Sequence, residues 1–106
     1  MAHPVNSHDI ADVLKAWDNA WKSANLVCRY RPNRQKIVEW CSEYPTDLVQ
    51  EAIEDGMPNF VRRIGARPDD TIRSGNAVFA INYFTGVLRN KFAQLADAPI
   101  EEGDHA

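Results

Sequence analysis

Apolar residues recur at three- and four-residue intervals from position 77 to position 95, and this stripe constrains the fold more than any other feature of the chain. At its centre, Phe84, Leu88 and Phe92 stand at successive four-residue steps. Residues spaced in this way share one face of a helix, so the pattern predicts a helix over about residues 76–96 that ends before Pro99. We expect the whole stripe to lie in the core: Ala77, Ala80, Ile81, Phe84, Leu88, Phe92 and Leu95.

A second amphipathic segment predicts a helix over about residues 8–25, with Ser7 as its cap. Its apolar face carries Trp17 and Trp21, and burial of each indole removes about 150 to 250 Å² from water. Such a face requires a large covering surface. We therefore expect these two residues, and Trp40 on the next apolar stripe, to be structural.

Proline and glycine residues divide the middle of the chain. Pro32 suits the start of a helix and predicts one over about residues 33–43. A third helix begins just after Pro45, and we expect Gly56 and Pro58 to end it, because both disfavour a helix interior.

Residues 57–75 form the least regular stretch of the sequence. Phe60, Val61 and Ile64 predict one short helical turn there, and Asp69-Asp70 predicts the cap of another. Together the elements predict an all-α fold, a single compact domain of about four main helices plus short turns. This domain spans residues 7–96, between an N-terminal tail at 1–6 and an acidic C-terminal tail at 97–106.

Composition narrows the class of protein. Hydrophobic residues make up 44% and charged residues 25% of the chain, which is typical of a globular domain. No apolar run approaches the roughly 20 residues that a membrane helix needs, so no membrane association is expected. Cys28 and Cys41 have neither a CxxC nor a zinc-ligand spacing, which favours free thiols and a cytoplasmic location.

Catalytic chemistry is not indicated. His3, His8 and His105 lie near the ends of the chain rather than in a cluster, and no phosphate-binding glycine loop or serine nucleophile motif is present. Asp69-Asp70 is a pair of acids, but adjacent loop acids are usually caps or turn residues. We expect no enzyme activity, no metal and no cofactor.

Charge is distributed in blocks. Residues 56–91 contain six Lys and Arg against two Asp, whereas 47–55 and 92–106 each contain four acids and no Lys or Arg. Arginine pairs well with phosphate because its guanidinium donates two parallel hydrogen bonds. The sequence therefore predicts a local nucleic-acid contact with weak, salt-sensitive binding, although a solvated loop is an equal alternative. The proposed contact residues are Arg62, Arg63, Arg67, Arg73, Phe79, Tyr83, Arg89, Asn90 and Lys91.

The outer face of the 76–96 helix offers a second kind of surface. Phe79 and Tyr83 flank this face, and Gly86 lies within it. Glycine is unfavourable inside a helix and often marks the close approach of another chain segment. These three residues predict a packing patch, for a partner chain, a nucleic-acid backbone or a crossing helix of the same domain.

The segment Asp47–Ile53, the irregular stretch after it and the run Tyr83–Asn90 resemble the C-terminal domain of the DnaD-type bacterial primosome and replication proteins, over about residues 30–95. That family carries a Tyr, an Ile and a Trp at four-residue steps, where this chain has Phe84, Leu88 and Phe92. The resemblance implies a small helical domain that binds DNA, often single-stranded, and helps to recruit a helicase.

Three hypotheses follow. The leading one is a non-catalytic replication accessory module that binds nucleic acid and a helicase or replication initiator. The alternative is a protein-interaction or dimerisation adaptor that does not bind nucleic acid and forms a homo-oligomer or a complex. A third is a helix-turn-helix regulator of unusual charge, which the acids of the third helix disfavour because they would repel DNA phosphates.

Overall fold

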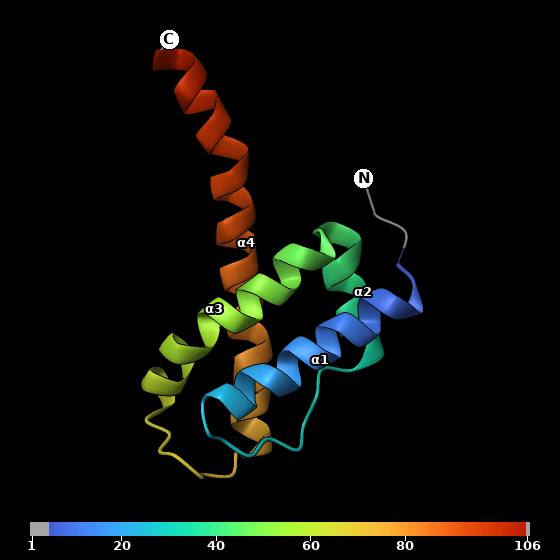
Figure 1. Cartoon of the computed structure of the whole chain (residues 1–106), viewed down its shortest axis with the longest axis vertical. Helices are drawn as coiled ribbons and strands as arrows, with labels where there is room; N and C mark the ends of the chain where they lie inside the picture. Colours follow the sequence, from blue (N-terminus) through green and yellow to red (C-terminus); the bar gives the residue numbers. More distant parts are fainter. Residues whose placement is uncertain (1–4, 106) are drawn as a thin grey trace.

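The computed structural model describes residues 5–105, with side chains described for residues 5–95. It contains four helices (Figure 1), namely α1 (Ser7–Ser23), α2 (Arg34–Glu43), α3 (Thr46–Ile64) and α4 (Ser74–His105). Over these residues the only β pairing is one isolated bridge. The predicted all-α single domain with four main helices is confirmed.

The first two helices begin at side-chain caps. At α1 the cap is Asn6 rather than Ser7: its side chain accepts from the Asp9 backbone N–H at 3.0 Å, and the Asp9 carboxylate accepts from the Asn6 N–H at 3.2 Å. This reciprocal pair satisfies two backbone donors that a helix start leaves free. At α2 the Asn33 side chain accepts from the Lys36 N–H at 2.8 Å, so the helix begins at Arg34.

The third helix is longer than predicted. It continues through Gly56 and Pro58, and the expected short turn at residues 60–64 is its last turn and a half. Gly56 is buried against α4, where a Cβ would lie 3.2 Å from the Phe84 ring, so the glycine permits contact between two helices instead of ending one. Burial of Met57 and Phe60 on either side of Pro58 offsets the backbone hydrogen bond that proline removes. The helix ends at Gly65, whose φ of 66° is the left-handed conformation of a helix C-cap.

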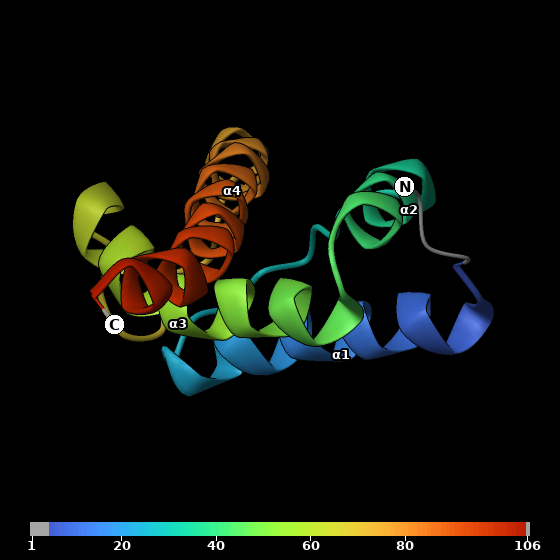
Figure 2. The same cartoon turned by 90° about the horizontal axis from the view of Figure 1, so that it is seen from above.

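The core lies where α1, α3 and α4 meet. Trp17, Phe60 and Phe84 are fully buried, and the Phe84 ring centroid lies 5.9 Å from that of Trp17 and 5.8 Å from that of Phe60. Trp21 packs edge-on against both Trp17 and Phe60. The view from above shows α2 and α4 on the same side of the layer that α1 and α3 form (Figure 2). The predicted structural role of the tryptophans is confirmed, since Trp40 is also buried and donates its indole N–H to Thr85 Oγ1 at 2.9 Å.

The fourth helix does not end before Pro99 but runs to His105, so residues 97–105 continue the helix instead of forming a separate tail. Its N-terminal half crosses α3, and its C-terminal part extends away from the other helices (Figure 1). The radius of gyration is accordingly 15.0 Å, against about 13 Å for a compact domain of this size. The expectation that Phe92 and Leu95 belong to the core is wrong, because they are 43% and 59% exposed.

Candidate nucleic-acid interface

Two long loops meet at one end of the molecule. The loop after α1 and the loop after α3 are joined by a parallel bridge between Val27 and Thr71 (Figure 1, bottom). The Val27 N–H donates to the Asp70 carbonyl at 2.9 Å, and the Ile72 N–H donates to the Val27 carbonyl at 2.7 Å. Asn25 and Asp69 both adopt positive φ here, a conformation that Asn and Asp tolerate better than other non-glycine residues.

The second loop therefore has a fixed path. The Asp70 side chain accepts from the Arg67 backbone N–H at 2.8 Å, and the Asp70 N–H donates to the Arg67 carbonyl at 3.0 Å. These contacts close a turn, so Asp69-Asp70 does not cap a helix as predicted. The consequence is that the arginines on both sides of the turn are presented from an ordered backbone.

Four of the predicted contact residues gather at this end, which we call the basic end: Arg62, Arg63, Arg67 and Arg73. All four are exposed, and none forms an ion pair with any residue whose side chain is described. Arg62 bonds to the neutral amide of Asn59. Their charges are thus available to an anionic ligand.

The remaining predicted cationic contacts lie elsewhere. They lie on α4, together with Asn90, which was also predicted as a contact. Asn90 is 16 residues from the start of the helix, or about 24 Å along its axis, and Arg89 and Lys91 are its neighbours in the sequence. Lys91 pairs with Asp55 at 3.1 Å and with Glu51 at 3.7 Å across the α3–α4 contact. The hydrogen bond that Lys91 donates to the Asp55 carboxylate raises the pKa of Lys91, despite a smaller opposing effect of burial. Arg89 is exposed but remote from the basic end, so the predicted residues do not form one continuous surface.

The aromatic residues proposed for stacking lie at the edge of the core. Phe79 is 38% exposed, and its ring centroid lies 5.3 Å from that of Phe60 and 5.9 Å from the Arg63 guanidinium carbon. Tyr83 is half-buried and packs against Phe60 at 5.4 Å. Phe79 therefore connects the basic end to the core, whereas Tyr83 is mainly a packing residue.

Gly86 faces open space. A Cβ built there would meet no atom within 4 Å, so within the described residues no helix of the same domain crosses this point. This excludes a crossing helix of the described residues as the reason for the glycine, and contact with a partner chain or a nucleic-acid backbone stays a prediction.

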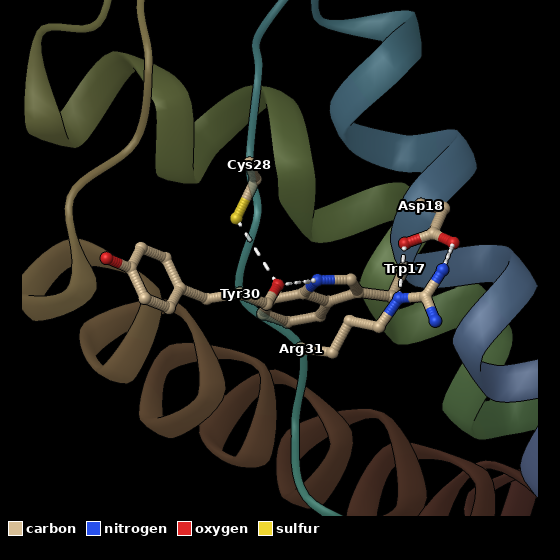
Figure 3. A network of polar contacts seen from close by, with 5 residues as sticks. All are labelled: Trp17, Asp18, Cys28, Tyr30 and Arg31. Carbon is tan, nitrogen blue, oxygen red and sulfur yellow. Dashed lines mark hydrogen bonds and ion pairs between the residues drawn. The ribbon is translucent and has the colours of Figure 1, made fainter.

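One candidate surface was missed by sequence reasoning. In the loop after α1, Arg29 and Tyr30 are exposed, and Arg31 turns toward α1, where it pairs with Asp18 (Figure 3). The Tyr30 carbonyl accepts the Trp17 indole N–H at 2.8 Å and the Cys28 thiol at 3.5 Å, which fixes the segment to the core. The signal was the alternation of cation and aromatic in Arg29-Tyr30-Arg31, a composition that suits nucleic-acid contacts.

The two thiols are free, as predicted, since no disulfide joins them. Burial raises the pKa of Cys28 and also that of Cys41, which keeps both as neutral thiols near pH 7. Neither thiol has the lowered pKa of an activated nucleophile.

No group of three or more His, Cys, Asp or Glu in the described part of the chain is placed to hold a metal ion. No helix in the described part of the chain is both long and apolar enough to cross a membrane. Comparison of the chain with protein-family models, with curated proteins and with solved structures gives no match.

Proposed function

We propose that this chain is a non-catalytic module that binds nucleic acid through the basic end. The observation that supports the proposal is the grouping of four exposed arginines on an ordered end of the fold, at Arg62, Arg63, Arg67 and Arg73, none of which pairs with an acid among the described side chains. Guanidinium groups pair with phosphate oxygens, and the bound counterions that phosphates release drive such binding. The acids of α3 and the acidic end of the sequence limit its strength, so we expect affinity to fall steeply with salt.

Two exposed aromatic residues favour a single-stranded ligand. Tyr30 is 46% exposed beside the joined loops, and Phe79 is 38% exposed beneath the Arg63 guanidinium. Unpaired bases stack on such rings, and each stacked base contributes about 1 to 3 kcal/mol. In a duplex the faces of the bases are stacked on one another, so a duplex could contact only the arginines and not the aromatic rings.

The resemblance to DnaD-type replication proteins gives this binding a context. We accordingly propose a replication accessory role with a helicase or initiator as the protein partner, in the cytoplasm. Support comes from the sequence pattern and from the free thiols. Phe84 and Leu88, at two of the three signature positions, are buried and serve the fold, so the nucleic-acid contact must be made by other residues.

A second candidate is a protein-interaction or dimerisation adaptor without nucleic-acid binding. Two separate surfaces of α4 favour it: the open space at Gly86 on the outer face, and the exposed Phe92 and Leu95 on the apolar stripe, either of which a partner chain could cover. A Gly86→Trp substitution would then change the oligomeric state measured by light scattering. If the basic end is the functional surface, this variant will bind oligonucleotides like the wild type.

The test is fluorescence anisotropy with labelled single- and double-stranded oligonucleotides at several salt concentrations. Arg73→Ala should weaken binding of every sequence and reduce the slope of log K against log salt by about 1, because one phosphate contact is lost. Arg89→Ala is the matched control: it removes the same charge from an exposed position on α4, away from the basic end. Equal losses for the two variants, or no binding by the wild type at low salt, would exclude the basic end as a nucleic-acid site.

A further inference from the structure

A second donor-rich site lies beside the basic end. An open cavity of about 620 Å³ separates the last turns of α1 from the loop that follows it. Three cationic side chains line it: Lys22 from α1, and Arg29 and Arg31 from the loop. The fold brings these charges together by turning the chain back along α1 after Asn25, whose left-handed backbone makes the turn.

The cavity retains positive charge after its internal pairing is counted. Asp18 is the one acid that lines it, and the Arg31 guanidinium donates to both oxygens of that carboxylate. Lys22 and Arg29 are exposed and form no ion pair with a described side chain. An anion that entered would therefore meet two free cations and a third held in place by Asp18.

One residue of the cavity lining carries a buried donor without a hydrogen-bond partner among the described residues. Trp21 lines the cavity and is 2% exposed, and its indole N–H has no hydrogen-bond partner among the described residues. A buried donor without a partner costs free energy, about 1 to 3 kcal/mol for a typical group. Trp17 differs, because its N–H is satisfied by the Tyr30 carbonyl. The polar groups of the cavity that lack an ion-pair partner among the described side chains, those of Lys22 and Arg29, are donors only, which suits an acceptor-only ligand.

We infer that this cavity binds a phosphate group. A phosphate offers several acceptor oxygens to guanidinium and ammonium groups, whereas a cation or an apolar ligand would leave these donors unpaired. Val27 lines the mouth of the cavity, is 45% exposed and offers an apolar contact for a sugar.

The position of the cavity indicates where the phosphate comes from. Arg29 follows Val27 by two residues, and Arg73 of the basic end follows Thr71 by two residues, on the two sides of one parallel bridge. A nucleic-acid backbone held at the basic end can therefore continue toward Arg29 and place the next phosphates in the cavity. In this form the inference rests on the proposed function; a free phosphate or a mononucleotide is the other source of the same group.

The experiment compares a double variant, Lys22→Gln with Arg29→Gln, with a control, Lys15→Gln with Arg34→Gln, which removes two exposed cations outside the cavity. Each protein is titrated with inorganic phosphate, with sodium chloride at matched ionic strength, and with a single-stranded oligonucleotide. Binding of phosphate is followed by the NMR signals of the indole N–H of Trp21 and of the loop amides. Because all four positions are exposed, the variants should keep the wild-type fold, which circular dichroism checks.

Phosphate, but not chloride, should shift the Trp21 indole signal of the wild type and the control in a saturable way. The double variant should lose this response and bind the oligonucleotide about five- to tenfold more weakly, which is the net effect of about one lost hydrogen bond. A double variant that matches the control in both titrations would overturn the cavity site.

The outcomes separate this inference from the proposed function. Oligonucleotide binding that depends on Arg73 but not on Lys22 and Arg29 would remove the cavity site and leave the basic end intact. A wild type that binds phosphate in the cavity but binds no oligonucleotide would support the cavity and exclude nucleic acid as its source.

Discussion

The two halves of α4 carry the same apolar stripe, but the stripe is buried in the first half and exposed in the second. In the first half, Phe84 and Leu88 are each 1% exposed, enclosed by α1 and α3. In the second half, Phe92 is 43% exposed and packs against Tyr44 with the ring centroids 5.2 Å apart, while Leu95 is 59% exposed. The spacing of apolar residues decides which face of a helix is apolar. Whether that face is buried depends on how far the neighbouring helices reach, which is a property of the whole fold.

The largest effect is expected when an apolar side chain is truncated in each half. The comparison tests whether the buried half contributes more to the free energy of unfolding than the exposed half. Phe84→Ala should lower the free energy of unfolding by about 3 to 5 kcal/mol, because it leaves a cavity among three aromatic residues, Trp17, Phe60 and Tyr83. Leu95→Ala should change it by at most about 0.5 kcal/mol, as at other exposed positions. Urea denaturation followed by circular dichroism measures both. Similar losses for the two variants would mean that the second half of α4 is covered in solution.

Substitution by alanine should change the stability in opposite directions at two glycines, Gly56 in the α3–α4 contact and Gly86 on the outer face of α4. Gly56→Ala should destabilise by about 1 to 3 kcal/mol, because the new methyl group would press on a Phe84 ring that its neighbours hold in place. Gly86→Ala should stabilise by about 0.5 to 1 kcal/mol, since alanine favours the helix and nothing lies within 4 Å. Thermal unfolding of the two variants should therefore move in opposite directions. A destabilised Gly86→Ala variant would reveal a partner packed on this face.

The smallest effect is expected at Lys91, on the boundary between the two halves. Its pairing with Asp55 and Glu51 raises its pKa, so the stabilisation is complete below the unfolded pKa of about 10.4 and is lost as pH rises through the higher folded pKa. Lys91→Met should cost up to about 1 kcal/mol near pH 7, as for other surface pairs. The difference from wild type should shrink above about pH 10.4 in urea titrations at a series of pH values. A difference that persists at high pH would indicate that the lysine acts through its aliphatic chain instead.

Local sequence signals predicted the helices well, and long-range contacts explain the errors. The first two helices and their apolar faces follow from periodicity and from Pro32, since those signals act within a few residues. Gly56 and Pro58 suggested a helix end because the sequence does not show that Gly56 lies against α4. The exposure of Phe92 could not be predicted for the same reason.

The candidate site was predictable only in part. The arginines of the second loop were identified by their number within an irregular segment, and the fold gathers four of them. Lys91 was grouped with them by its place in the sequence, but its acidic partners are 36 and 40 residues away along the chain. Arg29 and its neighbours were overlooked because only the bridge from Val27 to Thr71 brings the two loops together.

That bridge has a consequence for the order of events in folding. The helices of this fold can form from contacts close in sequence, whereas the bridge joins residues 44 positions apart and must wait for the loops between them to close. The surface that carries the arginines is therefore complete only when the two loops have met, and we expect this end to open by local fluctuations. Hydrogen exchange at the Val27 and Ile72 amides should report this opening. Any ligand that spans the two loops must slow it, because such a ligand binds only while the loops are joined.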